Sequence, residues 1–276
     1  MIKQAIIPLA GLGTRLLPLT SVFAKELLPI NGKPGLEYIL EECIEAGIKE
    51  VVFIISKKKL MIKKYFYNDK FYKDIIKKKN DPKIVKEYKK ILKYKKMIKF
   101  VFQDKPLGTG DAVYKTKKFI TDKYFLMLLP DDLIIKKNCS KSMITVHNKF
   151  KASVMASMKV NKNDVSRWGI YNIRKKIDKN NFIINNVVEK PSIKTSPSNN
   201  AVIGRYILPK TIFSKLKSLK PGKSGEFHIT DAIQALIEDD NQFIGHNFSG
   251  KYLDCGTMKG YIKSTLEISK QWNFAW

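Results

Sequence analysis

Short apolar runs rich in β-branched residues recur through the first half of the chain and alternate with longer polar stretches. They cover residues 5–9, 51–55, 100–102 and 124–129. Runs of this length, bounded by glycine or charged residues, are typical of buried strands. Between the first two, residues 33–49 carry apolar side chains at three- and four-residue spacing and end near Gly47, which predicts a helix with a glycine cap. This alternation of strand and helix predicts a doubly wound, mostly parallel, Rossmann-like α/β sheet.

The pattern changes after Pro130. Four further strand-like runs, at residues 153–160, 169–173, 182–188 and 202–208, are joined by turns rich in Asn, Lys, Gly and Pro. Strands linked in this way predict a smaller, more antiparallel subregion. Helical spacing returns at residues 209–219, 230–239 and 258–270. Because no repeat or low-complexity linker interrupts the chain, we expect one domain, residues 1–276, built from a first half (1–132) and a second half (133–276).

The chain is strongly basic. Its 276 residues include 52 Lys plus Arg against 25 Asp plus Glu, which gives a formal net charge of +27. Residues 61–99 are helical and lysine-rich, with Pro82 separating two helices, and we interpret them as a solvated face. Four of the cations are arginines, the residue that proteins favour for reading bases. We therefore expect no specific nucleic-acid partner, while a less specific polyanion-binding surface stays open.

The three cysteines, Cys43, Cys139 and Cys255, lie far apart in the chain and have no metal-ligand spacing. An odd number without a recognisable framework predicts free thiols, so a reducing cytoplasm is the expected location. No apolar run approaches the ~18 residues needed to cross a bilayer, so no membrane partner is expected.

The most informative short motif follows the first predicted strand and reads Leu-Ala-Gly-Leu-Gly-Thr-Arg over residues 9–15. Gly11 and Gly13 allow backbone N–H groups to approach a phosphate, although a short Gly-x-Gly is also a common turn. The dinucleotide-binding fingerprint fails because leucine holds its third glycine position, and no P-loop Gly-Lys-Ser/Thr follows. Arg15 and, ten residues later, Lys25 supply two cations of the kind that offset the charge of a triphosphate.

Two carboxylates follow apolar strands later in the chain. Asp131 comes directly after the run 124–129, and open α/β sheets bind ligands at the carboxyl ends of their strands. Carboxylate oxygens suit Mg²⁺, which takes one or two of them together with substrate phosphates. A strand-ending turn, where Asp is common, is the alternative interpretation. Asp254 follows another short apolar run, and the sequence does not show whether the two carboxylates converge.

A last pair of charged residues, Glu189 and Lys190, closes one predicted strand, and Gly169 opens its neighbour in the sequence. A carboxylate beside an ammonium can hold sugar hydroxyls and a phosphate, respectively. A surface ion pair is the simpler interpretation of the same two residues.

Taken in order, these segments resemble the nucleotide-sugar pyrophosphorylases, and among them the bacterial UTP–glucose-1-phosphate uridylyltransferases. The resemblance extends from about residue 4 to residue 266. It is carried by residues 8–15, 25–29, 42–48, 129–131, 188–191, 202–206, 229–233 and 254–256. Ordered matches over most of the chain are more specific than any single motif.

The resemblance implies a role for each matched position. Nucleotide binding would fall to Ala10, Gly11, Gly13, Thr14 and Glu26, with Gln103 and Gly108 at the uracil edge. Arg15 and Lys25 would be the catalytic cations, and Asp131 and Asp254 would hold Mg²⁺. Gly169, Glu189 and Lys190 would bind the sugar phosphate. The first half of the chain would then bind the nucleotide, and the second half the sugar.

The implied substrates are UTP and glucose 1-phosphate, in an enzyme that forms a homo-oligomer, a dimer or tetramer. Two alternatives stay open: a related enzyme that uses dTTP, since one methyl group gives a pocket modest discrimination, and a non-catalytic regulatory relative. The loop 103–112 departs from the family pattern because Asp111 stands where a histidine is usual. Details of the base pocket are therefore in doubt at this position.

Overall fold

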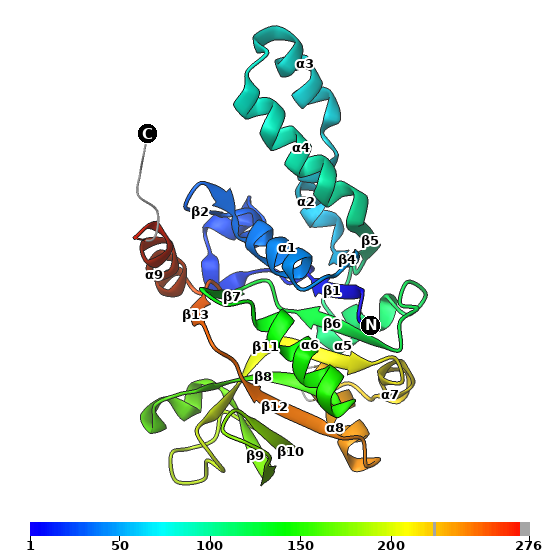
Figure 1. The fold of residues 1–276 in the computed structure, drawn as a ribbon, viewed down its shortest axis with the longest axis vertical. Coiled ribbons are helices and arrows are strands. Elements are labelled where there is room, and N and C mark those ends of the chain that lie inside the picture. Colours follow the sequence, from blue (N-terminus) through cyan, green and yellow to red (C-terminus); the bar gives the residue numbers. More distant parts are fainter. Residues whose placement is uncertain (223–224, 271–276) are drawn as a thin grey trace.

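The computed structural model describes residues 1–222 and 225–270. Its centre is a nine-stranded sheet with the order β5-β4-β1-β6-β11-β8-β12-β10-β9 (Figure 1). The strands are β1 (Gln4–Pro8), β4 (Glu50–Ile55), β5 (Ile98–Phe102), β6 (Tyr124–Leu128), β8 (Ser153–Lys159), β9 (Gly169–Lys176), β10 (Asn181–Glu189), β11 (Asn200–Pro209) and β12 (Phe243–Asn247). The eight strands expected from the apolar runs are all present, and β12 is one that the sequence pattern did not predict.

The sheet is mixed rather than mostly parallel. β5, β4, β1 and β6 run parallel to one another, with Ala5 opposite both Val51 and Leu126. β11 then lies between β6 and β8, antiparallel to both, while β12 is parallel to β8 and antiparallel to β10. The mostly parallel arrangement expected for the sheet holds for these first four strands, and the antiparallel subregion expected after Pro130 is present in the pairings of β8, β9, β10 and β11. Short turns join β9 to β10, and only antiparallel strands can be joined so tightly.

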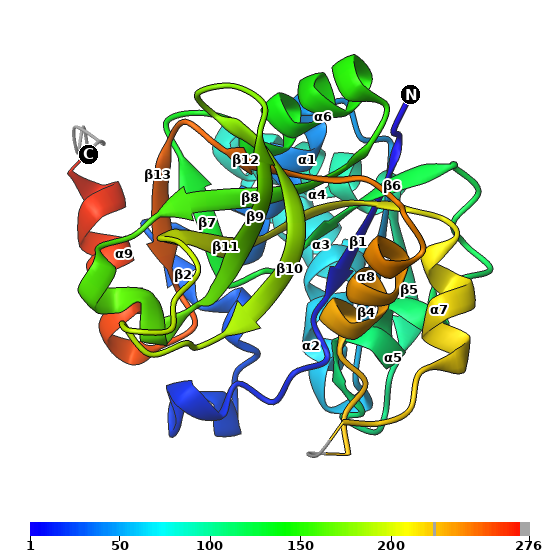
Figure 2. The same ribbon diagram turned by 90° about the horizontal axis from the view of Figure 1, so that it is seen from below.

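Helices cover both faces of the sheet, as the alternation of side chains along its strands requires. In β1, Ala5 and Ile7 belong to one hydrophobic core, and Ile6 belongs to the other. The first core is covered by α1 (Gly35–Glu45) and α6 (Cys139–Phe150), and the second by α5 (Gly108–Lys115), α7 (Ile212–Ser218) and α8 (Ile229–Glu238) (Figure 2). Gly47, which has a φ of +87°, lies just beyond α1, as predicted.

The lysine-rich stretch between β4 and β5 forms three helices. α2 (Leu60–Tyr67) packs on the body through Ile62 and Phe66. α3 (Asp69–Lys79) and α4 (Pro82–Met97) form a hairpin that projects from the body (Figure 1). We name this hairpin, residues 69–97, the lysine arm. The sequence predicts two helices here. Pro82 is indeed the first residue of α4, but a second break falls at Asn68.

Smaller elements surround the carboxyl ends of β1 and β6. β2 (Pro29–Ile30) pairs with β3 (Lys33–Pro34), and β7 (Asp132–Ile135) pairs with β13 (Lys251–Asp254). α9 (Met258–Ser269) follows β13 and begins at Thr257, whose hydroxyl accepts the Gly260 N–H. Within the described residues, none of the helices is both long enough and apolar enough to cross a membrane.

Candidate active site

The glycine loop leaves the sheet at the carboxyl end of β1, between the ends of β4 and β6. Ala10 is still buried, whereas Gly11 and Thr14 are exposed. Gly13 has a φ of +70°, and a Cβ on it would lie 3.0 Å from the Thr20 side chain. The Thr20 hydroxyl donates to the Gly13 carbonyl at 2.8 Å, which fixes the turn. A glycine is therefore needed at position 13, and the loop presents an exposed backbone at the edge where open α/β sheets bind ligands.

The two predicted catalytic cations both meet Asp131, which follows β6. Lys25 Nζ lies 2.8 Å from Asp131 Oδ2, and Arg15 Nη2 lies 3.5 Å from the same oxygen. Burial alone would lower the pKa of Lys25, but the charges of Asp131 and Glu26 outweigh it and raise that pKa. Burial opposes ionisation of Asp131 too, yet Lys25 and then Arg15 lower its pKa below the ordinary value. Both partners are thus charged at neutral pH.

Asp254 joins this cluster from β13. The register of β13 on β7 places it opposite Asp132, and the carbonyl of the adjacent Asp131 accepts the Cys255 N–H at 2.8 Å. The two carboxylates flank Gly256. A Cβ on Gly256 would lie 2.7 Å from Asp131 Oδ2, 3.2 Å from Asp254 Oδ1 and 3.0 Å from Arg15 Nη2. These distances leave no room for a side chain at position 256, so both carboxylates and Arg15 lie close to the glycine backbone, and the convergence that the sequence left open is present.

Asp132 holds the acidic loop in place. Its Oδ1 accepts the Tyr252 hydroxyl at 2.7 Å, and its Oδ2 accepts the Gly204 N–H at 2.8 Å. The Tyr252 ring packs edge-on against Trp168, with 5.5 Å between ring centroids. Burial and the neighbouring Asp131 raise the pKa of Asp132 to about 6. A continuous set of contacts therefore runs from the start of β9 to the Asp131 loop.

Glu26 lies beneath Lys25 and points inward. Both of its oxygens accept from Lys59 Nζ at 2.8 Å, and both side chains are almost completely buried. Burial raises the pKa of Glu26 and lowers that of Lys59, and each partner's charge opposes the shift of the other. The resemblance places Glu26 in the nucleotide pocket. Its orientation here fits a support for Lys25 rather than an open contact surface.

Arg205 is the largest fully buried side chain of the described residues. Its Nε and Nη2 donate to the Glu42 carboxylate at 3.1 and 2.8 Å. Its remaining donors reach the carbonyls of Leu129 (3.1 Å), Gly204 (3.0 Å) and Asp132 (2.5 Å). The ion pair is fully hydrogen-bonded, as a buried pair must be to offset desolvation. It ties the end of β6, and hence Asp131, to β11 and α1.

Gln103 closes the other side of the nucleotide half, after β5. Its amide N–H₂ group donates to the Gly108 carbonyl at 3.0 Å and to Asp111 Oδ2 at 2.8 Å. Since an ionised carboxylate can only accept, Asp111 fixes which way this amide faces. Gly108 has a φ of +93°, and a Cβ there would lie 2.5 Å from the Phe227 carbonyl. The departure from the family at position 111 thus has a structural role: it orients Gln103.

The predicted sugar-phosphate residues lie together on β9 and β10. Gly169 is opposite Glu189, and a Cβ on Gly169 would come within 3.0 Å of Glu189 Oε2. Lys190 has a φ of +46°, and its N–H donates to the Trp168 carbonyl at 2.9 Å. Glu189 and Lys190 are both exposed, with 3.9 Å between their charged atoms. In the described part of the chain, no hydrogen bond or ion pair joins these three residues directly to Lys25 or Asp131.

Strand β11 nevertheless connects the Asp131 loop with the Gly169–Glu189 pair, because both lie at the same end of the strands. The Gly204 carbonyl accepts the Leu129 N–H at the end of β6, and Ala201 is opposite Ile170 at the start of β9. Four residues of one strand therefore span the distance from the Asp131 loop to the Gly169–Glu189 pair. Adjacent strands lie ~4.8 Å apart, so the two groups face the same region.

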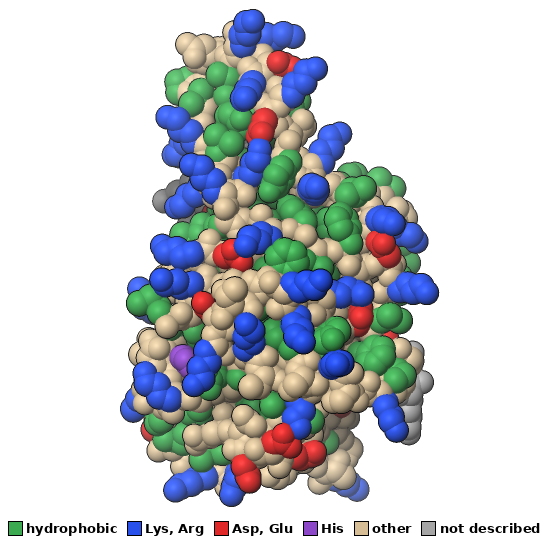
Figure 3. Space-filling view, turned by 90° about the vertical axis from the view of Figure 1, so that its right-hand side faces the viewer, with side chains coloured by type: hydrophobic (Ala, Val, Ile, Leu, Met, Phe, Trp, Pro, Cys, Tyr) green, Lys and Arg blue, Asp and Glu red, His purple; other side chains and the backbone are tan. Residues whose placement is uncertain are grey.

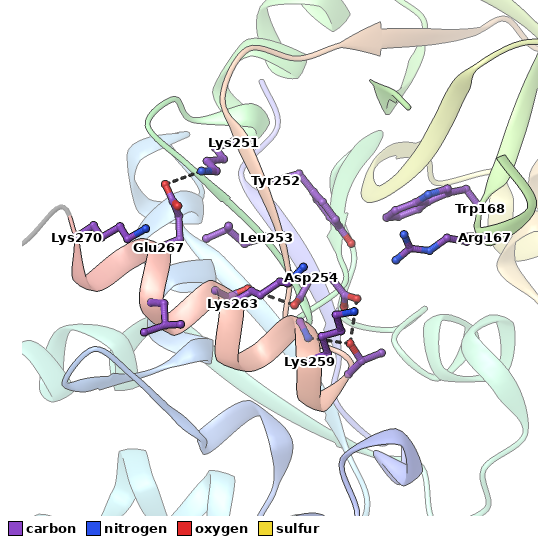
Figure 4. Close-up of a pocket in the computed structure, with 14 residues that line it drawn as sticks. Arg167, Trp168, Lys251, Tyr252, Leu253, Asp254, Lys259, Lys263, Glu267 and Lys270 are labelled. Atoms are coloured by element: carbon purple, nitrogen blue, oxygen red, sulfur yellow. Dashed lines mark hydrogen bonds and ion pairs between the residues drawn. The ribbon is translucent and has the colours of Figure 1, made fainter. Parts of the chain in front are cut away.

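A cavity of about 650 Å³ opens beside this edge (Figure 4). Asp254 lines it near the start of α9, and Arg167 and Trp168 line it from the opposite side. Lysines of β13 and α9 complete the wall, one of which, Lys251, is paired with Glu267 at 2.5 Å. The cavity extends from Asp254 to the start of β9, and its charged lining residues are mostly cations, which favours anionic ligands.

The carboxylates around Gly256 are suited to a cation that completes its shell with ligand oxygens. Among the described residues, no group of three or more His, Cys, Asp or Glu side chains is arranged to hold a metal ion. Two carboxylates are nevertheless enough for Mg²⁺ when phosphates supply further oxygens. The site therefore has the donor set of a metal held jointly by protein and substrate rather than of a closed metal site.

Comparison with known proteins identifies the family of this chain. A family model described as nucleotidyl transferase matches residues 4–271. The chain belongs to the nucleotidyl transferase family. It is 36% identical over 269 residues to UTP–glucose-1-phosphate uridylyltransferase 2 of Staphylococcus saprophyticus, covering 97% of this chain and 92% of that protein.

Solved structures of high similarity agree with this family placement. The structure of UDP-glucose pyrophosphorylase complexed with UDP-glucose has a TM-score of 0.86 and 33% identity, covering 99% of this chain and all of that one. The UTP-bound UDP-glucose pyrophosphorylase of Acinetobacter baumannii has a TM-score of 0.90 and 30% identity, covering 99% and 95% of the two chains. The nucleotidyl transferase fold of this chain is thus that of the UDP-glucose pyrophosphorylases, with mixed α/β content.

Three residues of this nucleotidyl transferase site were not identified from the sequence. Lys59 lies in a run of three lysines, two of which are exposed, and nothing in the run marks the buried one. Glu42 and Arg205 fall inside segments that carry the family resemblance, but their pairing joins positions 163 residues apart. The relevant signal was a charged residue within an otherwise apolar strand, as Arg205 is in β11.

Proposed function

We propose that this nucleotidyl transferase converts UTP and α-D-glucose 1-phosphate to UDP-glucose and pyrophosphate. The observation that carries the proposal is the convergence of Arg15, Asp131 and Asp254 at Gly256, at the carboxyl end of the central strands, with Lys25 paired to Asp131. Two cations and two carboxylates in that place are suited to a triphosphate and its counterion. The names of the uridylyltransferase and pyrophosphorylase relatives support the same choice of substrates.

UTP would bind across the ends of β1 and β5. The backbone of the loop 10–14 would receive the phosphates, since its glycines leave the N–H groups accessible. Gln103, held by Asp111, would present its amide carbonyl oxygen to the uracil N–H, and Gly108 leaves room beside it. We assign the nucleotide to the half of the chain up to residue 132 on these grounds.

Glucose 1-phosphate would bind at the ends of β9 and β10. The Glu189 carboxylate would accept hydrogen bonds from sugar hydroxyls, and the exposed Lys190 ammonium would pair with the phosphate. Gly169 keeps a side chain away from Glu189 and so leaves the sugar ring space. Because β11 brings this pair to the same edge as Asp131, the two substrates would approach one another over the Gly204 segment.

The reaction would be an in-line displacement at the α-phosphorus of UTP. A phosphate oxygen of glucose 1-phosphate forms the new P–O bond, and the bond to the pyrophosphate oxygen breaks on the opposite side. The attacking oxygen is already ionised near neutral pH, so no general base is required. Lys25 and Arg15 would hold the triphosphate and stabilise the charge that develops in the transition state, with positioning of the two anions supplying the rest.

Mg²⁺ is the counterion that we assign to Asp131 and Asp254. Both carboxylates lie close to Gly256, and their oxygen donors suit a hard cation. When bound, Mg²⁺ would supply positive charge to the phosphate oxygens of the substrates. Lys25, which pairs with Asp131 in this structure, would contribute its own charge to the same phosphates. We also expect a homo-oligomer, a dimer or tetramer, working in the cytoplasm.

The test is release of pyrophosphate by the purified protein supplied with Mg²⁺, one nucleoside triphosphate and one sugar 1-phosphate. We expect the highest kcat/KM with UTP and glucose 1-phosphate among UTP, dTTP, CTP and GTP. A higher kcat/KM with dTTP would mean that dTTP, rather than UTP, is the preferred nucleotide. No release with any pair would contradict enzymatic activity and favour a regulatory relative.

Replacing one metal carboxylate separates the cation's role from the fold. Asp131→Asn should raise the Mg²⁺ concentration needed for half-maximal rate by about tenfold or more, because the amide lacks the negative charge of the carboxylate. A Mg²⁺ titration of the initial rate measures the shift. Asp104→Asn, at an exposed carboxylate after β5, is the matched control and should leave the titration unchanged. An identical titration for Asp131→Asn and wild type would move the metal elsewhere.

A further inference from the structure

Positive charge is denser in the lysine arm than in the rest of the chain. Its 29 residues hold twelve lysines, four carboxylates and no arginine. About a tenth of the chain therefore supplies nearly a third of the net charge of +27. Within the described residues, Lys90 and Lys95 are the arm lysines that form ion pairs, and the other ten are exposed. A bias in composition alone would raise the lysine content everywhere and would not produce this local excess.

The arm also leaves apolar side chains uncovered among these lysines. None of the α3 residues is buried, although its Tyr72 stacks on Tyr88 of α4 with 5.1 Å between ring centroids. Phe71 is 54% exposed, and Tyr67, just before α3, is 40% exposed. A shallow hollow of about 480 Å³ lies at the tip, between the arm's turn and two α4 lysines. Lysine and apolar side chains are interspersed along the arm's surface (Figure 3).

We propose that the lysine arm docks on a membrane surface rich in anionic phospholipid headgroups. Clustered lysines are attracted to the negative potential of such a surface, and exposed aromatic side chains enter the boundary between headgroups and acyl chains. From the sequence we expect no membrane partner, because no apolar run is long enough to cross a bilayer. An arm that lies on the surface needs no such run.

Two other occupants fit the arm less well. Nucleic acid is usually bound with a contribution from arginine, whose planar fork pairs bidentately with phosphate, and the arm has lysines alone. A second copy of this chain would bring two arms of the same sign together, which costs Coulomb energy. An anionic lipid surface satisfies both the charge and the exposed Phe71.

The test is sedimentation of the full-length protein with vesicles. One set contains equal parts of phosphatidylglycerol and phosphatidylcholine, and the other contains phosphatidylcholine alone. We expect binding to the anionic set that weakens as salt is added, and none to the neutral set. The variant Lys77→Gln/Lys78→Gln/Lys79→Gln should lower the partition coefficient about tenfold or more, because three charges near the surface are removed.

Matched controls separate the arm from charge in general. Lys117→Gln/Lys118→Gln/Lys123→Gln removes three exposed lysines elsewhere and should change partitioning less than twofold. Phe71→Ser should weaken binding by about threefold or more, and Ile262→Ser, at an equally exposed apolar residue of α9, should not. Uridylyltransferase activity in solution and circular dichroism report whether each variant is folded.

Several outcomes would overturn the proposal. Equal losses for the two triple variants would mean that net charge alone attracts the protein. Equal binding to neutral vesicles, or no binding to either set, would remove the membrane. If the arm triple variant lost affinity for duplex RNA or DNA while its vesicle binding was unchanged, the partner would be nucleic acid. A change of oligomeric mass in that variant, again without a change in vesicle binding, would assign the arm to self-association.

Discussion

Three cations near the carboxyl ends of β1 and β6 are enclosed and paired, whereas most of those of the lysine arm are exposed to solvent. Lys25, Lys59 and Arg205 each contact a specific carboxylate, and Lys59 and Arg205 are almost wholly buried. Ten of the twelve arm lysines are exposed. A buried cation without its partner carries a large desolvation cost, while an exposed one is screened by water and salt. Cationic side chains therefore form specific ion pairs in one region and contribute mainly their summed charge in the other.

Removing Lys25 should produce the largest effect. Lys25→Ala eliminates the cation nearest Asp131, and with it much of the charge stabilisation at the transferred phosphorus, so kcat should fall about 10³-fold or more. Initial-rate kinetics with saturating UTP and glucose 1-phosphate measure the change. Lys58→Ala, an exposed lysine at the end of β4, is the control and should retain wild-type turnover. Turnover near wild type in Lys25→Ala would remove that residue from the mechanism.

Breaking the Arg205–Glu42 pair should come next, and it should act on stability. Arg205→Met leaves the Glu42 carboxylate buried without its cation, so the free energy of unfolding should fall by ~3–5 kcal/mol. Urea unfolding followed by circular dichroism gives that value. Arg167→Met, at an exposed arginine, should change it by less than ~0.5 kcal/mol. If Arg205→Met proved as stable as Arg167→Met, the pair would have no role in holding the Asp131 loop.

The Lys59–Glu26 pair lets positioning be separated from direct contact. Lys59→Met should lower kcat by about tenfold to a hundredfold, because an unpaired Glu26 would compete with Asp131 for Lys25. In the double variant Glu26→Gln/Lys59→Met the competing charge is gone, so part of the rate should return. KM for UTP should change little in either protein. A large rise in KM with unchanged kcat would instead make Glu26 a nucleotide contact.

The lysine arm should show the smallest effect in solution. The triple variant Lys77→Gln/Lys78→Gln/Lys79→Gln removes exposed charges that form no ion pair within residues 1–222 and 225–270, so kcat/KM should stay within about twofold and the free energy of unfolding within ~0.5 kcal/mol. The same rate assay and urea titration apply. A tenfold loss of activity in the triple variant, measured without vesicles, would contradict this prediction and would mean that the arm takes part in catalysis.

Local pattern was sufficient to predict the parallel half of the sheet. The runs that became β1, β4 and β6 are continuous and apolar because helices cover both of their faces, so burial leaves a direct mark on the sequence. Strand order left no such mark. β11 begins more than 70 residues after β6 ends, yet it pairs with β6, and no local property of residues 200–209 specifies that neighbour.

The residues of the candidate site likewise fall into those that local sequence could predict and those that depend on long-range contacts. Gly13 could be identified because its motif reflects a backbone conformation that glycine adopts readily. The residues of the site that support others could not be identified. Lys59 is one lysine in a run of three, and its burial depends on Glu26 being directly opposite once the chain has folded. The meeting of Asp131 and Asp254 likewise requires the β7–β13 pairing, which long-range structure determines.

Arg205 has a consequence for how the chain acquires its structure. The carbonyls that it binds, at Leu129, Gly204 and Asp132, and its partner Glu42 come from segments made early and late in synthesis. Until β11 has emerged from the ribosome and docked beside β6, the Asp131 loop lacks its anchor and Glu42 lacks its counter-charge. Contacts this distant in sequence close slowly because the entropy of a long loop must be lost first. The contacts that anchor the Asp131 loop to Arg205 therefore form only after β6 itself has been synthesised.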